Sequence, residues 1–251
     1  MLEIHDLTAG YPGRQVLQSV SLSIPAGQVT VLAGPNGSGK STLLKALAGI
    51  LPCEKALFLD GQPLHTLSPR ELAQKIAYLP QNHPVPEITA ERLVLHGRFP
   101  YLSYPRRYRA EDHRIAREAM ERLDISQLAE RSLTTLSGGQ RQKVYIAMAL
   151  AQDTPVVLLD EPTTYLDIAH RLQLMTLARL LAAEGKTVVL VLHDLAMAME
   201  QGDHLVSLSH GTVAAQGSPE AVYESGVLGQ VFGVEVSRVE TPGGWRYFYG
   251  I

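Results

Sequence analysis

Cysteine is nearly absent from this sequence of 251 residues, in which Cys53 is the only one. A single thiol cannot form an internal disulfide, and the sequence has neither a C-x-x-C pair nor a cluster of Cys and His with zinc-site spacing. These absences exclude a disulfide-stapled secreted scaffold and a cysteine-rich metal module. The expected compartment is the reducing cytoplasm.

A strong excess of charge of one sign is also missing. The formal net charge is -3 and the isoelectric point is near 6.3. Such a chain has no general electrostatic field that attracts the phosphate backbone of DNA or RNA. We therefore expect no nucleic-acid partner.

Long hydrophobic runs do not occur. The longest apolar stretches, such as residues 188–192, have the length of a strand, whereas a membrane-spanning helix needs about 20 apolar residues. The first ten residues carry acids and lack the basic-then-apolar layout of a secretion signal. Any role at a membrane is expected to depend on partner proteins.

Short apolar runs rich in β-branched residues recur along the chain, at Val29 to Ala33, Val156 to Leu159 and Val188 to Leu192. Each is followed by a turn signal or a helical pattern. Continuous apolar runs of this length are typical of parallel strands buried on both faces, with helices packed around them. The sequence therefore predicts an α/β fold.

Between Asn82 and Arg131 the sequence becomes charged and helix-favouring, and Ile115, Ala119 and Leu123 recur at every fourth position. This spacing places three apolar side chains on one face of a helix. We interpret the segment as an inserted helical subdomain.

Several local signals mark the ends of elements. Thr89 is suited to cap a helix that Gly97 ends, and the basic, aromatic segment Arg98 to Arg109 is expected to be a surface loop. Ser218 begins another helix, and Thr241 to Gly244 read as a turn between two short strands.

The most specific motif matches G-x-x-x-x-G-K-[ST] and lies between the strand at residues 29–33 and a helix expected to begin near Thr42. Its glycines let backbone N–H groups approach phosphate oxygens, and the helix amino terminus favours negative charge. Lys40 would neutralise the β- and γ-phosphates, and Ser41 would bind Mg²⁺. A plain glycine-rich turn is the alternative. The motif residues are Gly34, Pro35, Asn36, Gly37, Ser38, Gly39, Lys40, Ser41 and Thr42.

The base is expected to be adenine. Guanine sites usually carry an Asn-Lys-x-Asp segment, and neither Asn36 nor Asn82, the two asparagines of the chain, begins one.

Two acids, Asp160 and Glu161, end the apolar run at residues 156–159. Open α/β sheets bind ligands at the carboxyl ends of their strands. Asp160 would organise Mg²⁺ and its waters, and Glu161 would orient and deprotonate the attacking water. The same pair could instead cap the next turn.

His193 follows the run at residues 188–192, which would bring it to the same edge of the sheet. It could contact the γ-phosphate or hold the water and Glu161 in place. A purely structural histidine is the alternative.

A second glycine motif, Leu136-Ser137-Gly138-Gly139-Gln140, precedes a helical pattern from Arg141 to Ala151. This helix start is another candidate phosphate receptor, and it is most useful if it closes the side of the nucleotide that the first motif leaves open. The motif could also be an N-cap and loop.

Together these motifs resemble those of ABC (ATP-binding cassette) ATPases, and the resemblance covers almost the whole chain. It implies a P-loop NTPase core with a mainly parallel sheet and an antiparallel β subdomain at 1–81 and 152–251, and a helical subdomain at 82–151 that carries the second motif. It also implies a head-to-tail dimer in which Ser137, Gly138, Gly139 and Gln140 of one subunit complete the ATP site of the other.

The resemblance assigns roles to three further residues. Gln81 would sense Mg²⁺ and nucleotide, Tyr11 would stack on adenine, and Asp167 would contact the second subunit. Taken alone, Tyr11 could simply pack against its neighbours, and Asp167 could be a turn acid.

Four segments, at 79–83, 91–95, 97–101 and 160–170, resemble importer ATPases for ferric siderophores, haem and cobalamin. The resemblance implies two transmembrane permease subunits, an external substrate-binding protein and a place on the cytoplasmic face of the membrane; ferric siderophore is the favoured cargo. The rival interpretations are a soluble ABC ATPase, such as one for iron-sulfur cluster assembly, and a P-loop kinase.

Overall fold

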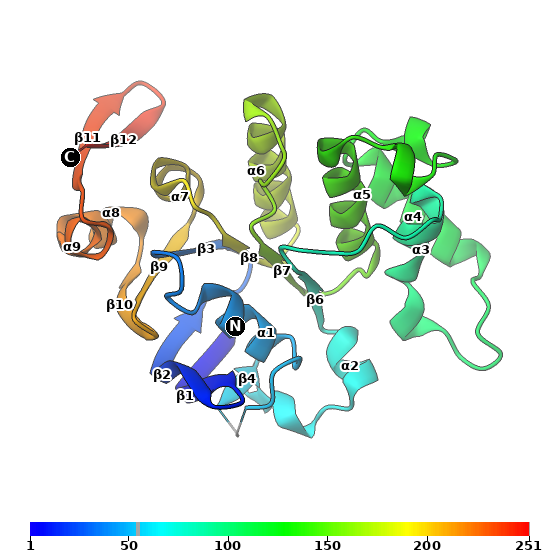
Figure 1. Cartoon of the computed structure of the whole chain (residues 1–251), viewed down its shortest axis with the longest axis horizontal. Helices are drawn as coiled ribbons and strands as arrows, with labels where there is room; N and C mark the ends of the chain where they lie inside the picture. Colours follow the sequence, from blue (N-terminus) through cyan, green and yellow to red (C-terminus); the bar gives the residue numbers. More distant parts are fainter. Residues whose placement is uncertain (54–55, 251) are drawn as a thin grey trace.

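The central element is a six-stranded sheet, shown in Figure 1 for the computed structural model, which describes residues 1–53 and 56–250. The strand order is β10-β9-β3-β8-β7-β6, and all neighbours are parallel except β9 and β10. The strands are β3 (Val29–Ala33), β6 (Ile76–Leu79), β7 (Val156–Asp160), β8 (Thr187–Val191), β9 (His204–Ser209) and β10 (Thr212–Gly217).

The three predicted strands are β3, β7 and β8, and every residue in them is buried. Burial on both faces explains why their sequences are continuous apolar runs rather than alternating ones. The prediction of an α/β fold with a mainly parallel sheet is confirmed.

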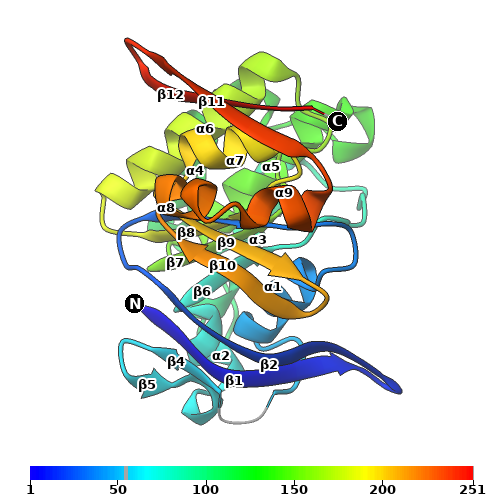
Figure 2. The same cartoon turned by 90° about the vertical axis from the view of Figure 1, so that its left-hand side faces the viewer.

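A second sheet is antiparallel and has the order β2-β1-β4-β5. Its apolar side chains form one buried cluster with those of helix α1, which contacts strands of both sheets (Figure 2). Helix α1, which follows β3, is thus packed between the central sheet and the antiparallel sheet. The elements are β1 (Leu2–Tyr11), β2 (Arg14–Ile24), β4 (Leu57–Leu59), β5 (Gln62–Pro63) and α1 (Lys40–Leu47).

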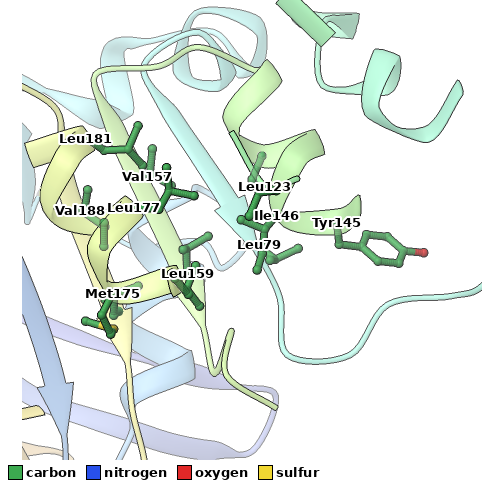
Figure 3. Packing of buried hydrophobic residues seen from close by; sticks show 14 of the residues in the cluster. Leu79, Leu123, Tyr145, Ile146, Val157, Leu159, Met175, Leu177, Leu181 and Val188 are labelled. Carbon is green, nitrogen blue, oxygen red and sulfur yellow. The ribbon is translucent and has the colours of Figure 1, made fainter. Parts of the chain in front are cut away.

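The other face of the central sheet is covered by helices that share a larger core with it. Figure 3 shows Ile146 of α5 near Leu79 of β6, and Leu177 and Leu181 of α6 near Val157 of β7. The division of the chain at residues 82 and 151 stays a prediction. The helices against the sheet are α5 (Gly138–Ala151), α6 (Ile168–Ala183) and α7 (Leu195–Gln201), whereas α3 (Ala90–His96) and α4 (Ala110–Glu121) pack against α5.

Within residues 1–53 and 56–250, no helix is both long enough and apolar enough to cross a bilayer. The remaining elements are short. They are α2 (Pro69–Ala73), α8 (Pro219–Glu224), α9 (Val227–Phe232), the hairpin of β11 (Glu235–Thr241) and β12 (Gly244–Gly250), and 3₁₀ turns at Leu64–Thr66, Phe99–Tyr101, Ser126–Leu128 and Leu133–Thr135.

Most of the predicted element ends are confirmed. The Thr89 hydroxyl accepts a hydrogen bond from the N–H of Arg92 at the start of α3, and the Ser218 hydroxyl accepts one from the N–H of Ala221 at the start of α8. Gly97 follows α3, and Thr241 pairs with Gly244 across the hairpin turn.

One predicted helix start is two residues late, and one of three apolar positions predicted on a helix face lies just outside the helix. Helix α1 begins at Lys40 rather than near Thr42, because Gly39, in the left-handed conformation, is already its N-cap. Helix α4 ends at Glu121, so Leu123 lies beyond it, although its side chain is buried in the core.

The prediction of a surface loop from Arg98 to Arg109 is wrong at its first residue, because Arg98 is buried. Its Nε is 3.1 Å from Oδ1 of Asp112, and its Nη1 donates to the carbonyl of Ala151. Its guanidinium carbon lies 4.0 Å from the ring centroid of Tyr101. These partners replace the water that an arginine would otherwise need.

Candidate nucleotide site

The loop between β3 and α1 has a backbone that two of its glycines make possible. Gly34 has φ 149° and Gly39 has φ 107°, in the region that favours glycine. A Cβ at Gly34 would lie 2.2 Å from the carbonyl oxygen of Leu208, and one at Gly39 would lie 2.6 Å from Cδ2 of Leu17. The loop therefore follows this path only with glycine at both positions.

Lys40 opens α1 and turns its ammonium group back over the loop. Its Nζ donates hydrogen bonds to the carbonyls of Gly34 at 2.8 Å and Pro35 at 2.9 Å. Burial lowers the pKa of Lys40, whereas the negative charges of Glu161 and Asp160 act to raise it. The side chain is a buried cation in the middle of a loop shaped for an anion.

A cavity of about 420 Å³ opens over this loop. Tyr11 is one of the lining residues; its hydroxyl accepts a hydrogen bond from Nζ of Lys45, and the residue is 41% exposed. Arg14 and Val16 also line the cavity, and neither could be predicted from the sequence because neither stands in a motif. The lining residues are Tyr11, Arg14, Val16, Asn36, Gly37, Gly39, Lys40, Ser41, Thr42, Gln81, Glu161 and His193.

Ser41 and Asp160 meet beneath the cavity. The Ser41 hydroxyl donates to Oδ1 of Asp160 at 3.0 Å, and the hydroxyl of Tyr78, on β6, donates to Oδ2 at 3.3 Å. Mg²⁺ commonly takes one or two carboxylates together with substrate phosphates and waters. The hydroxyl and the single carboxylate therefore fit a magnesium ion that a nucleotide helps to bind.

The Asp160 carboxyl has a raised pKa because it is buried; Glu161 adds to the rise, and the hydroxyls of Ser41 and Tyr78 oppose it. A raised pKa means that the folded chain holds this proton more tightly than the unfolded chain. The free energy of unfolding therefore falls as the pH rises from 3.8, the ordinary pKa of an aspartate, through the raised pKa of Asp160. At neutral pH the ionised carboxylate destabilises the nucleotide-free chain.

Replacing Asp160 with Asn is expected to stabilise the nucleotide-free chain at neutral pH, with a gain that shrinks toward pH 4. Urea unfolding of both proteins in EDTA, at steps from pH 4 to pH 7, measures this difference. A difference that does not change with pH would contradict the argument.

Glu161 follows β7 with φ 51°, a conformation uncommon for a residue other than glycine. Its Oε1 lies 2.7 Å from Nε2 of His193, and its Oε2 accepts a hydrogen bond from Nε2 of Gln81. The amide of Gln81 thus contacts Glu161 rather than the pair of Ser41 and Asp160. Three chain segments far apart in sequence fix the direction of one carboxylate.

The second glycine motif begins α5. The Ser137 hydroxyl accepts a hydrogen bond from the N–H of Gln140, whose side chain accepts one from the N–H of Ser137. A Cβ at Gly138 would lie 3.4 Å from Cβ of Tyr165, and one at Gly139 would lie 3.2 Å from the Tyr165 carbonyl oxygen. Within the part of the chain that the structure describes, no residue of this motif lines the cavity.

Asp167 is the N-cap of α6. Its carboxylate accepts a hydrogen bond from the N–H of His170 and lies 2.7 Å from Nδ1 of the same residue. The backbone N–H of His170 is the main cause of the lowered pKa of Asp167. The side chain is exposed and faces away from the core.

Comparison with known proteins gives a consistent result. The family model described as ABC transporter matches residues 17–164. The achromobactin transport ATP-binding protein of Dickeya dadantii is 42% identical over 94% of this chain and 89% of its own length. The iron(3+)-hydroxamate import ATP-binding protein of Bacillus subtilis is 42% identical over 96% and 91%, and the hemin import ATP-binding protein of Nocardia farcinica is 43% identical over 92% and 80%.

Solved structures agree. A metal-chelate-type ABC transporter in an inward-facing conformation has a TM-score of 0.84 with 26% identity, over 99% of this chain and 96% of that one. A bacterial ABC transporter cassette solved as a dimer has a TM-score of 0.76 with 30% identity, over 87% and 99%. The chain belongs to the ABC transporter family and is one of its ATP-hydrolysing subunits.

Proposed function

We propose that this chain is the motor subunit of an importer and that ATP hydrolysis takes place in the cavity above the loop at residues 34–39. The observation that carries the proposal is the placement of Glu161. Its carboxylate lies between Gln81 and His193 and lines the same cavity as Lys40 and Ser41. A base fixed at the edge of a phosphate cradle is the arrangement that hydrolysis requires.

Different residues of the chain would bind the nucleotide, accept the proton and position the base. Lys40 and the loop N–H groups hold the phosphates, and Tyr11 offers an exposed ring for the adenine. Glu161 accepts the proton of the attacking water, while Gln81 and His193 keep its carboxylate aimed. Ser41 and Asp160 would hold Mg²⁺, which neutralises phosphate charge when bound.

The second glycine motif is proposed to act on the nucleotide of a second copy. Ser137 to Gln140 expose a helix start, yet they do not line the cavity of their own chain within the described residues. A helix start favours anions. Two copies placed head to tail would bring each motif to the other's ATP, with Asp167 at the contact, and hydrolysis would reopen the pair.

The proposed membrane partners are two permease subunits, which would hold the chain at the cytoplasmic face and work with an external binding protein. The docking surface is Phe99, Tyr104 and Arg106: Phe99 is 48% exposed, Tyr104 is 97% exposed, and the Arg106 guanidinium lies 4.7 Å from the Phe99 ring. Exposed aromatic and arginine side chains are enriched at interfaces.

Hydrogen bonds and packing connect this docking surface, through α2, to strand β6 of the central sheet. The carbonyl of Pro100 accepts hydrogen bonds from the side chains of Arg70, in α2, and Gln74, the residue after α2. Helix α2 packs beside β6, the strand that leads to Gln81. A partner that moves the surface would therefore act on the loop that holds Glu161.

A ferric siderophore is the proposed cargo, with haem and cobalamin as alternatives. The relatives named above are transport proteins for achromobactin, iron(3+)-hydroxamate and hemin. The cargo itself would be bound by the other subunits.

Co-purification tests the importer proposal. The tagged chain, extracted in mild detergent from its native cells, should carry two hydrophobic multi-span subunits with it. A chain carrying Phe99→Ser and Tyr104→Ser should lose them while keeping its folded circular dichroism spectrum. Recovery of soluble scaffold proteins instead would favour the rival interpretation, a soluble ABC ATPase.

A further inference from the structure

Tyr78 reaches the carboxylate of Asp160 from the side opposite Ser41. Its hydroxyl donates to Oδ2 at 3.3 Å, while Ser41 donates to Oδ1 at 3.0 Å. We propose that Tyr78 is a positioning residue that sets the metal preference of the nucleotide site, because it occupies one oxygen of Asp160 and leaves only the other turned toward Ser41. This inference rests on the proposed role of Asp160 in holding Mg²⁺.

The position of Tyr78 in the sheet makes this contact possible. Tyr78 lies on β6 opposite Leu158 of β7, and Asp160 comes two residues later on the same strand. Side chains two residues apart on a strand point to the same face, so the ring can lean along β7 to the carboxylate. The hydroxyl is thus carried to Asp160 by backbone pairing of two parallel strands.

The ring of Tyr78 is partly buried and packs against the apolar cluster that α1 and the antiparallel sheet share. It lines a cavity of about 430 Å³ together with apolar side chains of α1, α2 and β6, including Leu47, Leu72 and Ile76. The ring thus has nonpolar neighbours, while the hydroxyl has its partner in Asp160. This division suits an amphipathic side chain that is fixed in place.

Holding one oxygen of a carboxylate affects which metal the other oxygen accepts. A carboxylate with both oxygens free can bind in a bidentate manner, which Ca²⁺ accepts readily in its variable coordination shell. Mg²⁺ demands a near-ideal set of single oxygens and keeps several waters. With Oδ2 bound to Tyr78, Asp160 offers one oxygen, and this arrangement favours Mg²⁺ over Ca²⁺.

Removing the hydroxyl alone tests the idea. Tyr78→Phe keeps the ring among its nonpolar neighbours, and calorimetry measures ATP affinity of the full chain in EDTA, in Mg²⁺ and in Ca²⁺. We expect unchanged affinity in EDTA, a loss of about tenfold in Mg²⁺, the size typical of outer-shell changes at metal sites, and a smaller loss in Ca²⁺. Tyr247→Phe is the matched control, because Tyr247 is buried in the distant C-terminal hairpin, where its ring packs edge-on against that of Tyr223.

Equal losses in EDTA, Mg²⁺ and Ca²⁺ would show that Tyr78 has only a structural role, and an affinity in Mg²⁺ equal to that of the native chain would also overturn the proposal. Unfolding midpoints in the same buffers identify a variant that is merely unstable. In an Asp160→Asn background, Tyr78→Phe should cause no further loss, because the two act through one carboxylate. If Asp160→Asn abolishes the gain in ATP affinity that Mg²⁺ gives, but Tyr78→Phe in the native chain changes nothing, the role of Tyr78 alone is rejected. If Asp160→Asn leaves that gain intact, the proposed role of Asp160 itself is rejected.

Discussion

Replacing Glu161 with Gln is expected to lower ATP turnover of the assembled complex at least about 100-fold, while ATP binding persists. Glutamine keeps the shape of the side chain and an oxygen that can accept from His193 or Gln81, but it cannot take a proton from water. ATP-bound chains should therefore accumulate as closed dimers. Phosphate release measures turnover, and light scattering after gel filtration with ATP measures the dimer.

A second glutamate provides the control for this experiment. Glu200 lies on α7, where it accepts a hydrogen bond from Arg246 and another from the N–H of Tyr247, and it does not line the cavity. Glu200→Gln makes the same chemical change and should leave turnover unchanged. Normal turnover in Glu161→Gln would reject Glu161 as the base, and loss of ATP binding there would reveal damage to the cradle instead.

Replacing Arg98 with Ala is expected to lower the free energy of unfolding by about 3 kcal/mol. The change leaves the Asp112 carboxylate buried, with the N–H of Arg109 as a remaining donor, and it frees the carbonyl of Ala151. It also removes the packing of the guanidinium on Tyr101. Equilibrium unfolding in urea, followed by circular dichroism, measures the difference.

Arg114 supplies the comparison, because it lies on the same helix as Asp112 and pairs with Glu111 and Glu118 on the exposed surface. Arg114→Ala removes two ion pairs that water screens, so its unfolding midpoint should stay close to that of the native chain. If both substitutions lowered the free energy of unfolding equally, burial would not be the reason that the pair of Arg98 and Asp112 stabilises the fold.

Local rules explain why much of the fold could be predicted. The runs at β3, β7 and β8 are apolar along their whole length because both faces of a central parallel strand are buried. The P-loop could be placed because its glycines, lysine and helix start are adjacent in sequence. Thr89 and Ser218 were found as helix caps for the same reason, since a cap acts on residues three positions away.

Local rules also misplaced some features. The segment after Gly97 is basic and aromatic, which is typical of a surface loop, and nothing near it in the sequence shows that Arg98 turns inward. Its partners, Asp112 and Ala151, come from α4 and α5, and only the packing of these helices brings them together. The start of α1 was placed two residues late because the conformation of Gly39 has no signature in the sequence beyond glycine itself.

The sequence by itself determined the fold class, the glycine-rich loop before α1 and the position of the two acids at the end of β7, because each depends on neighbouring residues or on a short repeating pattern. Only the tertiary structure decided that Gln81 reaches Glu161 and that Tyr78 reaches Asp160. It also selected between the roles that the sequence left open for His193, which contacts Glu161. Gln81 and Glu161 are 80 positions apart in the chain. Contacts of this kind arise from the pairing order of the strands, which brings β6, β7 and β8 side by side, and no local pattern encodes that order.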